Sequence, residues 1–222
     1  MVLMKSIDIP GVFQDRNKLF TQNLKECKNL KIYNERIIRY KGNELRSWNP
    51  YRSKLAAAML NGLSYQIKSD SSVLYLGAAT GTTVSHISDI TSQGIIYAVE
   101  NSPVAMKKLL EVCKTRKNII PILSDANHPE RYGHIVSNVD FIYQDISQRN
   151  QAEIFLENIE RFLSENGTGI LMVKARSIDV SLKPNEAYKR VCLELEKSKL
   201  KIHEIVDLKP YEKDHAAILI SY

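Results

Sequence analysis

The sequence of 222 residues contains little cysteine and no long hydrophobic run. Its 3 cysteines, Cys27, Cys113 and Cys192, are far apart and form no C-x-x-C pair, so we expect neither a disulfide framework nor a zinc site. No stretch approaches the ~18 consecutive apolar residues of a membrane span, and the N-terminus lacks the apolar segment of a signal peptide. We therefore expect a cytoplasmic protein without a bound metal.

Internal repeats, low-complexity tracts and Gly/Ser linkers are also missing. A chain of this length suits one α/β domain with a small additional subdomain. The formal net charge of +6 is compatible with a polyanionic partner such as nucleic acid. Excess lysine also occurs on proteins that bind no polyanion, so this charge is weak support.

Residues 1–48 are predicted to form a small β-rich subdomain, followed by a larger domain over residues 49–222. Short β-rich segments at 11–14, 31–34, 35–42 and 45–48 are separated by Asn-Glu and Lys-Gly-Asn turn signals. The exposed face of this antiparallel sheet is expected to bind a partner or simply to be solvated. Its basic residues would be Arg16, Lys18, Lys25, Lys28, Lys31, Arg36, Arg39, Lys41 and Arg46.

Strands and helices are predicted to alternate through the larger domain, which indicates a mostly parallel sheet with helices on both faces. Asn49 and Pro50 are expected to begin a helix that ends at Gly62 and carries Lys54 in its first turn, where a lysine opposes the helix dipole. A hairpin at the end of the chain adds one antiparallel strand. The expected strands lie near 73–77, 95–100, 119–123, 139–144, 169–174, 203–208 and 215–221, and the further helices near 82–91, 102–116, 128–135, 149–164 and 184–199.

The stretch from Val73 to Thr83 is predicted to be a buried strand that turns sharply into a helix. Its pattern G-A-A-T-G-T-T lacks the second glycine of G-x-G-x-x-G, which disfavours a dinucleotide. Glu100 ends the next strand about twenty residues later, where a carboxylate can accept hydrogen bonds from ribose hydroxyls. A nucleoside without phosphates satisfies both observations, and S-adenosylmethionine (AdoMet) is the common one.

Polar residues follow each of the predicted strands, and the carboxyl ends of parallel strands meet at one crevice. Glu100 would accept the ribose hydroxyls and Asp125 the adenine amine, while Thr82 and Thr83 would receive the methionyl carboxylate at a helix N-terminus. Each acid taken alone is more simply a strand-end cap, but several strand ends agree. The predicted cofactor residues are Gly77, Ala78, Thr82, Thr83, Glu100, Asn101, Asp125, Ala126, Asp145, Ile146, Ser147 and Gln148.

Five blocks of the sequence resemble the fibrillarin family, the box C/D ribonucleoprotein methyltransferases. The blocks are YRSK at 51–54, LGAATGTT at 76–83, DFIYQDISQ at 140–148, VKARSID at 173–179 and PYEKDHA at 210–216. The resemblance is to the archaeal form, because no Gly/Arg-rich segment is present. It implies a class I AdoMet-dependent methyltransferase fold, with a seven-stranded, mostly parallel sheet. One departure is Asn101, where the family usually has an aromatic residue.

The resemblance implies 2′-O-methylation of ribose in rRNA and tRNA, and its Lys-Asp-Lys-His set corresponds to Lys54, Asp145, Lys174 and His215. A ribose hydroxyl is a very weak acid, so the site must supply a base and cations near the developing oxyanion. Lys174 is the candidate base, and Asp145 is expected to hold it in place. Lys54 would steer the target hydroxyl or a phosphate, and His215 would orient or accept a hydrogen bond.

The sequence shows no RNA-recognition motif or zinc knuckle, so the chain alone should select RNA poorly. The resemblance implies that this selection comes from partners. The implied partners are a box C/D guide RNA with its target RNA, a Nop-type scaffold protein and a kink-turn-binding ribosomal-type protein. Arg176, Lys183 and Lys189 follow the fifth strand and would contact an RNA backbone. Two alternatives stay open: a non-catalytic assembly scaffold with this fold, and a methyltransferase with a protein or small-molecule acceptor.

Overall fold

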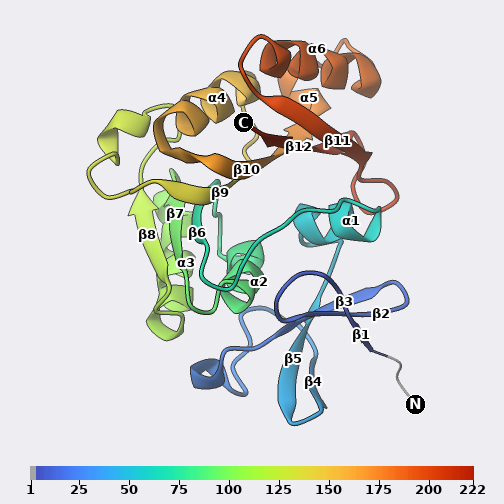
Figure 1. The fold of residues 1–222 in the computed structure, drawn as a ribbon, viewed down its shortest axis with the longest axis vertical. Helices are drawn as coiled ribbons and strands as arrows, with labels where there is room; N and C mark the ends of the chain where they lie inside the picture. Colours follow the sequence, from blue (N-terminus) through green and yellow to red (C-terminus); the bar gives the residue numbers. More distant parts are fainter. Residues whose placement is uncertain (1–3) are drawn as a thin grey trace.

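A seven-stranded sheet lies at the centre of the larger part of the protein in the computed structural model, which describes residues 4–222 (Figure 1). Its strand order is β11-β12-β10-β9-β6-β7-β8, and only β12 runs antiparallel to its neighbours. The antiparallel strand therefore lies one place in from the edge. The strands are β6 (Ser72–Leu76), β7 (Ile95–Glu100), β8 (Ile119–Leu123), β9 (Val139–Gln144), β10 (Leu163–Lys174), β11 (Lys201–Asp207) and β12 (His215–Ser221).

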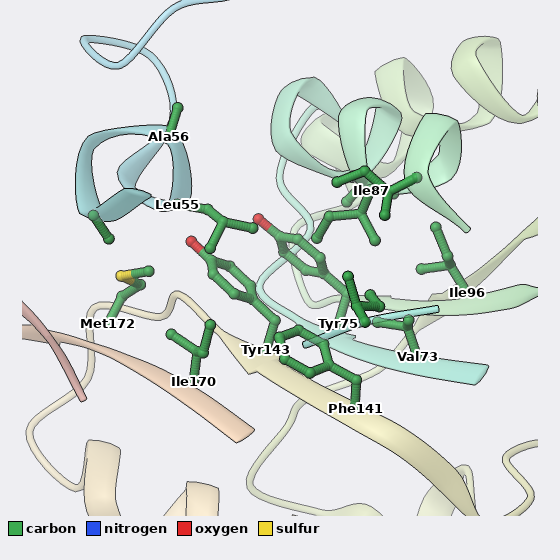
Figure 2. Close-up of a cluster of buried hydrophobic side chains, with 14 of the residues drawn as sticks. Leu55, Ala56, Val73, Tyr75, Ile87, Ile96, Phe141, Tyr143, Ile170 and Met172 are labelled. Atoms are coloured by element: carbon green, nitrogen blue, oxygen red, sulfur yellow. The ribbon is translucent and has the colours of Figure 1, made fainter. Parts of the chain in front are cut away.

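Helices cover both faces of this sheet, as the alternation of strands and helices predicts. Side chains of α1, α2 and α3 pack on one face and those of α4 and α6 on the other. Figure 2 shows the first face, where Leu55 of α1 lies over the paired rings of Tyr75 and Tyr143, whose centroids are 4.6 Å apart. The helices are α1 (Lys54–Leu60), α2 (Thr82–Ile90), α3 (Pro103–Thr115), α4 (Gln151–Phe162), α5 (Ala175–Ile178) and α6 (Pro184–Glu196).

Two of the predicted helices differ in the structure, and one observed helix was not predicted. The first begins at Lys54 with Ser53 as its N-cap, because the Asn49 side chain accepts a hydrogen bond from the Tyr51 N–H and forms a turn instead. The segment 128–135 holds only the short 3₁₀ turn Pro129–Arg131, and α5 was not predicted. No helix within residues 4–222 combines the length and the apolar character that crossing a membrane requires.

A second, antiparallel sheet forms the N-terminal part of the chain, with the strand order β1-β2-β3-β5-β4. It confirms the predicted β-rich character, but 31–34 is a loop and β3 was not predicted. Arg46, expected on the exposed face, is fully buried. The elements are β1 (Lys5–Ser6), β2 (Val12–Asp15), β3 (Lys18–Gln22), the 3₁₀ turn η1 (Lys25–Cys27), β4 (Ile37–Tyr40) and β5 (Asn43–Trp48).

Arg46 is buried because it joins the N-terminal sheet to α2 through a network of charged groups. Its guanidinium forms ion pairs of 2.8 Å with Glu35 and 2.8 Å with Asp89, and all three side chains are inaccessible to solvent. Arg116 forms a third ion pair of 2.7 Å with Asp89. Two guanidinium groups therefore neutralise two carboxylates inside the protein, and each charge depends on its partners for stabilisation.

The Glu35 carboxylate should make the free energy of unfolding depend on pH in the acidic range. Burial alone would raise its pKa, but hydrogen bonds from the Ile32 N–H and the Arg46 charge outweigh burial and lower the pKa below its ordinary 4.5. A lowered folded-state pKa means that Glu35 stabilises the protein above about pH 4.5, and that this contribution is lost as the pH falls through the folded pKa. We expect Glu35→Gln to reduce the free energy of unfolding at pH 7, and this deficit to shrink below pH 4.5 in urea titrations. A deficit that is constant with pH would contradict the prediction.

Candidate active site

Lys54 and Asp145 form an ion pair at the carboxyl end of the central strands. Lys54 is the first residue of α1, and its Nζ donates to both Asp145 carboxylate oxygens, at 2.7 and 2.9 Å. Asp145 directly follows β9, where its backbone N–H donates to the Leu76 carbonyl. The expectation that Asp145 holds Lys174 is therefore wrong, because both of its oxygens face Lys54.

Lys174 and His215 are direct cross-strand neighbours, so their side chains share the face of the sheet that α1 covers. Lys174 forms no ion pair with a carboxylate anywhere in residues 4–222. The His215 Nδ1 lies 2.6 Å from the Lys213 carbonyl oxygen, which can only accept, so Nδ1 carries a proton. In the neutral ring this leaves Nε2 as an acceptor.

Gln151 fixes the backbone of Lys174 and was missed in the sequence. The β9–β10 ladder ends at the Leu171–Gln144 pair, three residues before Lys174. Beyond it, the fully buried Gln151 side chain accepts from the Lys174 N–H at 3.0 Å and donates to the Lys174 carbonyl at 3.2 Å. Its amide thus replaces the missing strand partner. A glutamine at a helix start carries no pattern that would have revealed this role.

Asp145 also lines a cavity of about 300 Å³. This volume lies in the ~300–1,000 Å³ range of small-molecule sites. The cavity contains nine of the predicted cofactor residues: Gly77, Glu100, Asn101, Asp125, Ala126, Asp145, Ile146, Ser147 and Gln148. Ala79, Val99 and Ser124 line it as well and were not predicted. Asp145 therefore belongs both to this cavity and to the charged cluster, by which we mean Lys54, Asp145, Lys174 and His215.

The remaining predicted cofactor residues, Ala78, Thr82 and Thr83, are not part of the cavity lining. Ala78 and Thr83 are buried, and the Thr83 hydroxyl donates to Ser53 at 3.0 Å. Because Ser53 is the N-cap of α1, this bond ties the start of α1 to the start of α2. The Thr83 side chain therefore supports Lys54 rather than facing the cavity.

Two carboxylates in the cavity are held in place by backbone groups. Glu100 accepts from the Ala79 N–H at 2.7 Å and the Ser102 N–H at 2.8 Å, one on each oxygen. Asp125 accepts from the backbone and side chain of Asn127, at 3.0 and 2.8 Å, and these bonds lower the pKa of Asp125. Each Glu100 oxygen keeps a further lone pair, and Oδ2 of Asp125 takes no part in the two bonds from Asn127, so both carboxylates can accept hydrogen bonds from a ligand.

Asn127 is a second residue that the sequence did not reveal. Its side-chain amide also donates to Gln148 at 2.8 Å, and its oxygen accepts from Asn150 at 2.9 Å. Gln148, one of the predicted cofactor residues, is thus linked to Asp125, on the side expected for adenine. Only its bond to Asp125 had a local signal, because an Asx turn between Asp125 and Asn127 is a common motif.

The glycine turn after β6 leaves space for a ligand. Gly77 has a φ of +85°, and a Cβ there would fall on the carbonyl oxygen of Asp145. Ala79 also has a positive φ, of 48°, which aims its N–H at Glu100. The close approach of Gly77 to Asp145, the two fixed carboxylates and the absence of a basic phosphate-binding side chain among the lining residues suit a nucleoside such as AdoMet.

Gly77→Ala should therefore weaken cofactor binding strongly. The methyl group would displace Asp145, and the left-handed backbone adds about 1–2 kcal/mol of strain. We expect AdoMet affinity to fall roughly tenfold or more, measured by isothermal titration calorimetry. Gly62→Ala is the matched control, because Gly62 has a φ of +101° but open space around its Cβ position. Equal effects of both substitutions on affinity would contradict the proposed role of Gly77.

Comparisons with known proteins agree with this geometry. Residues 4–222 match the family model described as fibrillarin. The chain is 48% identical over 211 residues to the fibrillarin-like rRNA/tRNA 2′-O-methyltransferase of Methanothermobacter thermautotrophicus, covering 95% of this chain and 93% of that protein. Aeropyrum pernix fibrillarin, solved with natively bound S-adenosyl-L-methionine, aligns with a TM-score of 0.86 at 43% identity, covering 99% and 100% of the two chains. A chain of a fibrillarin/Nop5p complex aligns with a TM-score of 0.90 at 46% identity, covering 98% and 99%.

Proposed function

Because the chain belongs to the fibrillarin family, we propose that it transfers a methyl group from AdoMet to the 2′-hydroxyl of ribose in rRNA and tRNA. The Methanothermobacter relative carries this activity in its name, and the Aeropyrum relative binds S-adenosyl-L-methionine. The observation that carries the proposal is the position of Asp145. It lines the nucleoside-sized cavity and pairs with Lys54, so cofactor site and charged cluster adjoin.

The cavity residues divide between the parts of the cofactor. Glu100 would accept the ribose hydroxyls and Asp125 the adenine amine, each with an oxygen held by a backbone N–H. The bound sulfonium supplies an electrophilic methyl group. Gly77 lets the turn after β6 approach the Asp145 backbone closely, and Gly77 and Ala79 both line the cavity.

The charged cluster would activate the attacking hydroxyl. Lys174 has no carboxylate partner within residues 4–222, so it is our candidate for the group that takes the 2′-hydroxyl proton. Lys54, fixed by Asp145, would place positive charge beside the developing oxyanion. Nε2 of His215, directed by the bond from Nδ1 to Lys213, would accept a hydrogen bond that orients the hydroxyl or the Lys174 amine.

The partners follow from the family and from one relative. A fibrillarin has been solved in complex with Nop5p, which supports a Nop-type scaffold for this chain. We further propose a box C/D guide RNA that selects the target and a kink-turn-binding ribosomal-type protein that completes the particle. A guide is required because phosphate contacts position an RNA without reading its bases.

Methyl transfer from radiolabelled AdoMet to a guided target RNA tests the function. We expect transfer to a target with ribose at the selected nucleotide and none to the same target with 2′-deoxyribose there. Transfer to both, or loss of label only after protease treatment, would indicate another acceptor. Absence of transfer although AdoMet binds would indicate a non-catalytic scaffold.

A further inference from the structure

A groove of about 840 Å³ lies between the N-terminal sheet and the loop that precedes β12. Its walls come from β3, β4, the turn at 49–51 and Tyr211. The rings of Tyr51 and Tyr211, which both line the groove, meet edge to face with their centroids 5.2 Å apart. None of the proposed catalytic residues lines the groove. The groove also shares no lining residue with the AdoMet cavity, so the two are distinct.

The groove is positively charged. Lys18, Arg36 and Arg39 line it and are exposed, and none of the three forms an ion pair with any residue in 4–222. Asp15 is the single acidic residue in its lining. Cations that no internal carboxylate neutralises attract an anionic ligand.

The groove also presents aromatic rings. Tyr51 is 63% exposed, an unusual position for a large ring in water. Tyr40 and the buried Trp48 line the groove as well. Aromatic faces interleaved with basic side chains are the features with which proteins hold unpaired nucleic acid strands.

The Tyr51 and Tyr211 rings in the groove lie close to the charged cluster. Tyr51 precedes Lys54 by three residues and Tyr211 precedes His215 by four, so the Cα separations are at most about 11 and 14 Å. The Asn61 side chain donates to the carbonyls of Asp207 and Lys209, both at 2.7 Å, and fastens this loop to α1. A strand that passes from the catalytic lysines into the groove is therefore within reach of the two tyrosines.

We propose that this groove binds the unpaired stretch of the substrate RNA strand that flanks its guide-paired segment. A base would stack on Tyr51, and Arg36 and Arg39 would contact the phosphates that follow. A double helix does not fit this chemistry, because its bases are already stacked on one another and proteins contact it mainly through its backbone and minor groove. The inference rests on the proposed function, and it assigns a substrate-binding role to the N-terminal sheet.

Two target RNAs with the same guide-paired segment test the proposal in the complete ribonucleoprotein. One ends at the duplex, and the other continues into unpaired nucleotides. The variants are Tyr51→Ala and the pair Arg36→Gln with Arg39→Gln, and the matched control is the pair Lys28→Gln with Lys31→Gln, which removes equal charge from the N-terminal part outside the groove. KM for RNA, kcat and the salt dependence of KM are measured at saturating AdoMet.

We expect the wild type to have a lower KM for the extended RNA. Tyr51→Ala and the double arginine variant should each raise that KM by roughly tenfold, with kcat and the KM of the trimmed RNA unchanged. The arginine variant should also reduce the salt slope by about 1.4, because each lost contact to a single strand removes ~0.7. The lysine control should behave as wild type.

Three results would overturn the proposal. Equal increases in KM for both RNAs would assign the groove to the duplex, and loss of scaffold-protein binding by the arginine variant would assign it to that protein. Unchanged KM in every variant would mean that no RNA enters it. A wild-type particle that does not methylate even the trimmed RNA would instead contradict the proposed function, and this inference with it.

Discussion

Lys174→Met is expected to lower kcat for methyl transfer by about 10²–10⁴-fold, the usual contribution of a general base. AdoMet affinity should stay close to that of wild type, because Lys174 does not line the cofactor cavity. Its backbone is held by Gln151, so the substitution removes the amine without moving β10. Single-turnover rates with a guided RNA, together with calorimetric AdoMet binding, measure both quantities.

Lys54→Met is the comparison that identifies the base. Lys54 is bound to Asp145 through both carboxylate oxygens and supplies charge, so its loss should lower kcat less than the loss of Lys174 does. Near-normal transfer by Lys174→Met with an inactive Lys54→Met would show that the base is assigned wrongly.

The sequence predicted those features that a local or periodic pattern encodes. The glycine turn, the acidic end of β7 and the alternation of strands and helices predicted a cavity at the carboxyl ends of these strands, and nine of the residues that line it were among those predicted. The parallel strands impose this outcome, because their carboxyl ends converge on one edge whatever the loops contain. The four proposed catalytic residues came from the resemblance instead.

Side-chain partners far apart in the sequence were not predicted. Asp145 lies 91 residues from Lys54, and no local pattern indicates that it pairs with Lys54 rather than with Lys174. Arg46 was assigned to the exposed face together with the other basic residues of the N-terminal segments, and its partners Glu35 and Asp89 come from a loop and a helix. Gln151 and Asn127 act through amide groups whose role depends on neighbours brought together only by the folded chain.

Arg46→Met should produce the largest loss of stability, about 3–5 kcal/mol in the free energy of unfolding. Methionine matches much of the buried volume, so the loss comes from the Glu35 and Asp89 carboxylates that remain without this guanidinium. Asp89 keeps Arg116, whereas Glu35 keeps no cation within the part of the chain that the structure describes. Arg39→Met, an exposed change on the neighbouring strand β4, should alter stability by no more than about 0.5 kcal/mol in the same urea titrations.

The double variant Arg46→Met with Glu35→Gln separates lost attraction from an unpaired charge. If the cost of Arg46→Met arises chiefly from the Glu35 carboxylate left in the interior, removing that charge should restore part of the stability, and the double variant should be more stable than the sum of the two single losses predicts. Strictly additive losses would show that the two residues stabilise the protein independently. Coupling would mean that the N-terminal sheet is attached to α2 by mutually dependent charges, and that this attachment weakens as a unit.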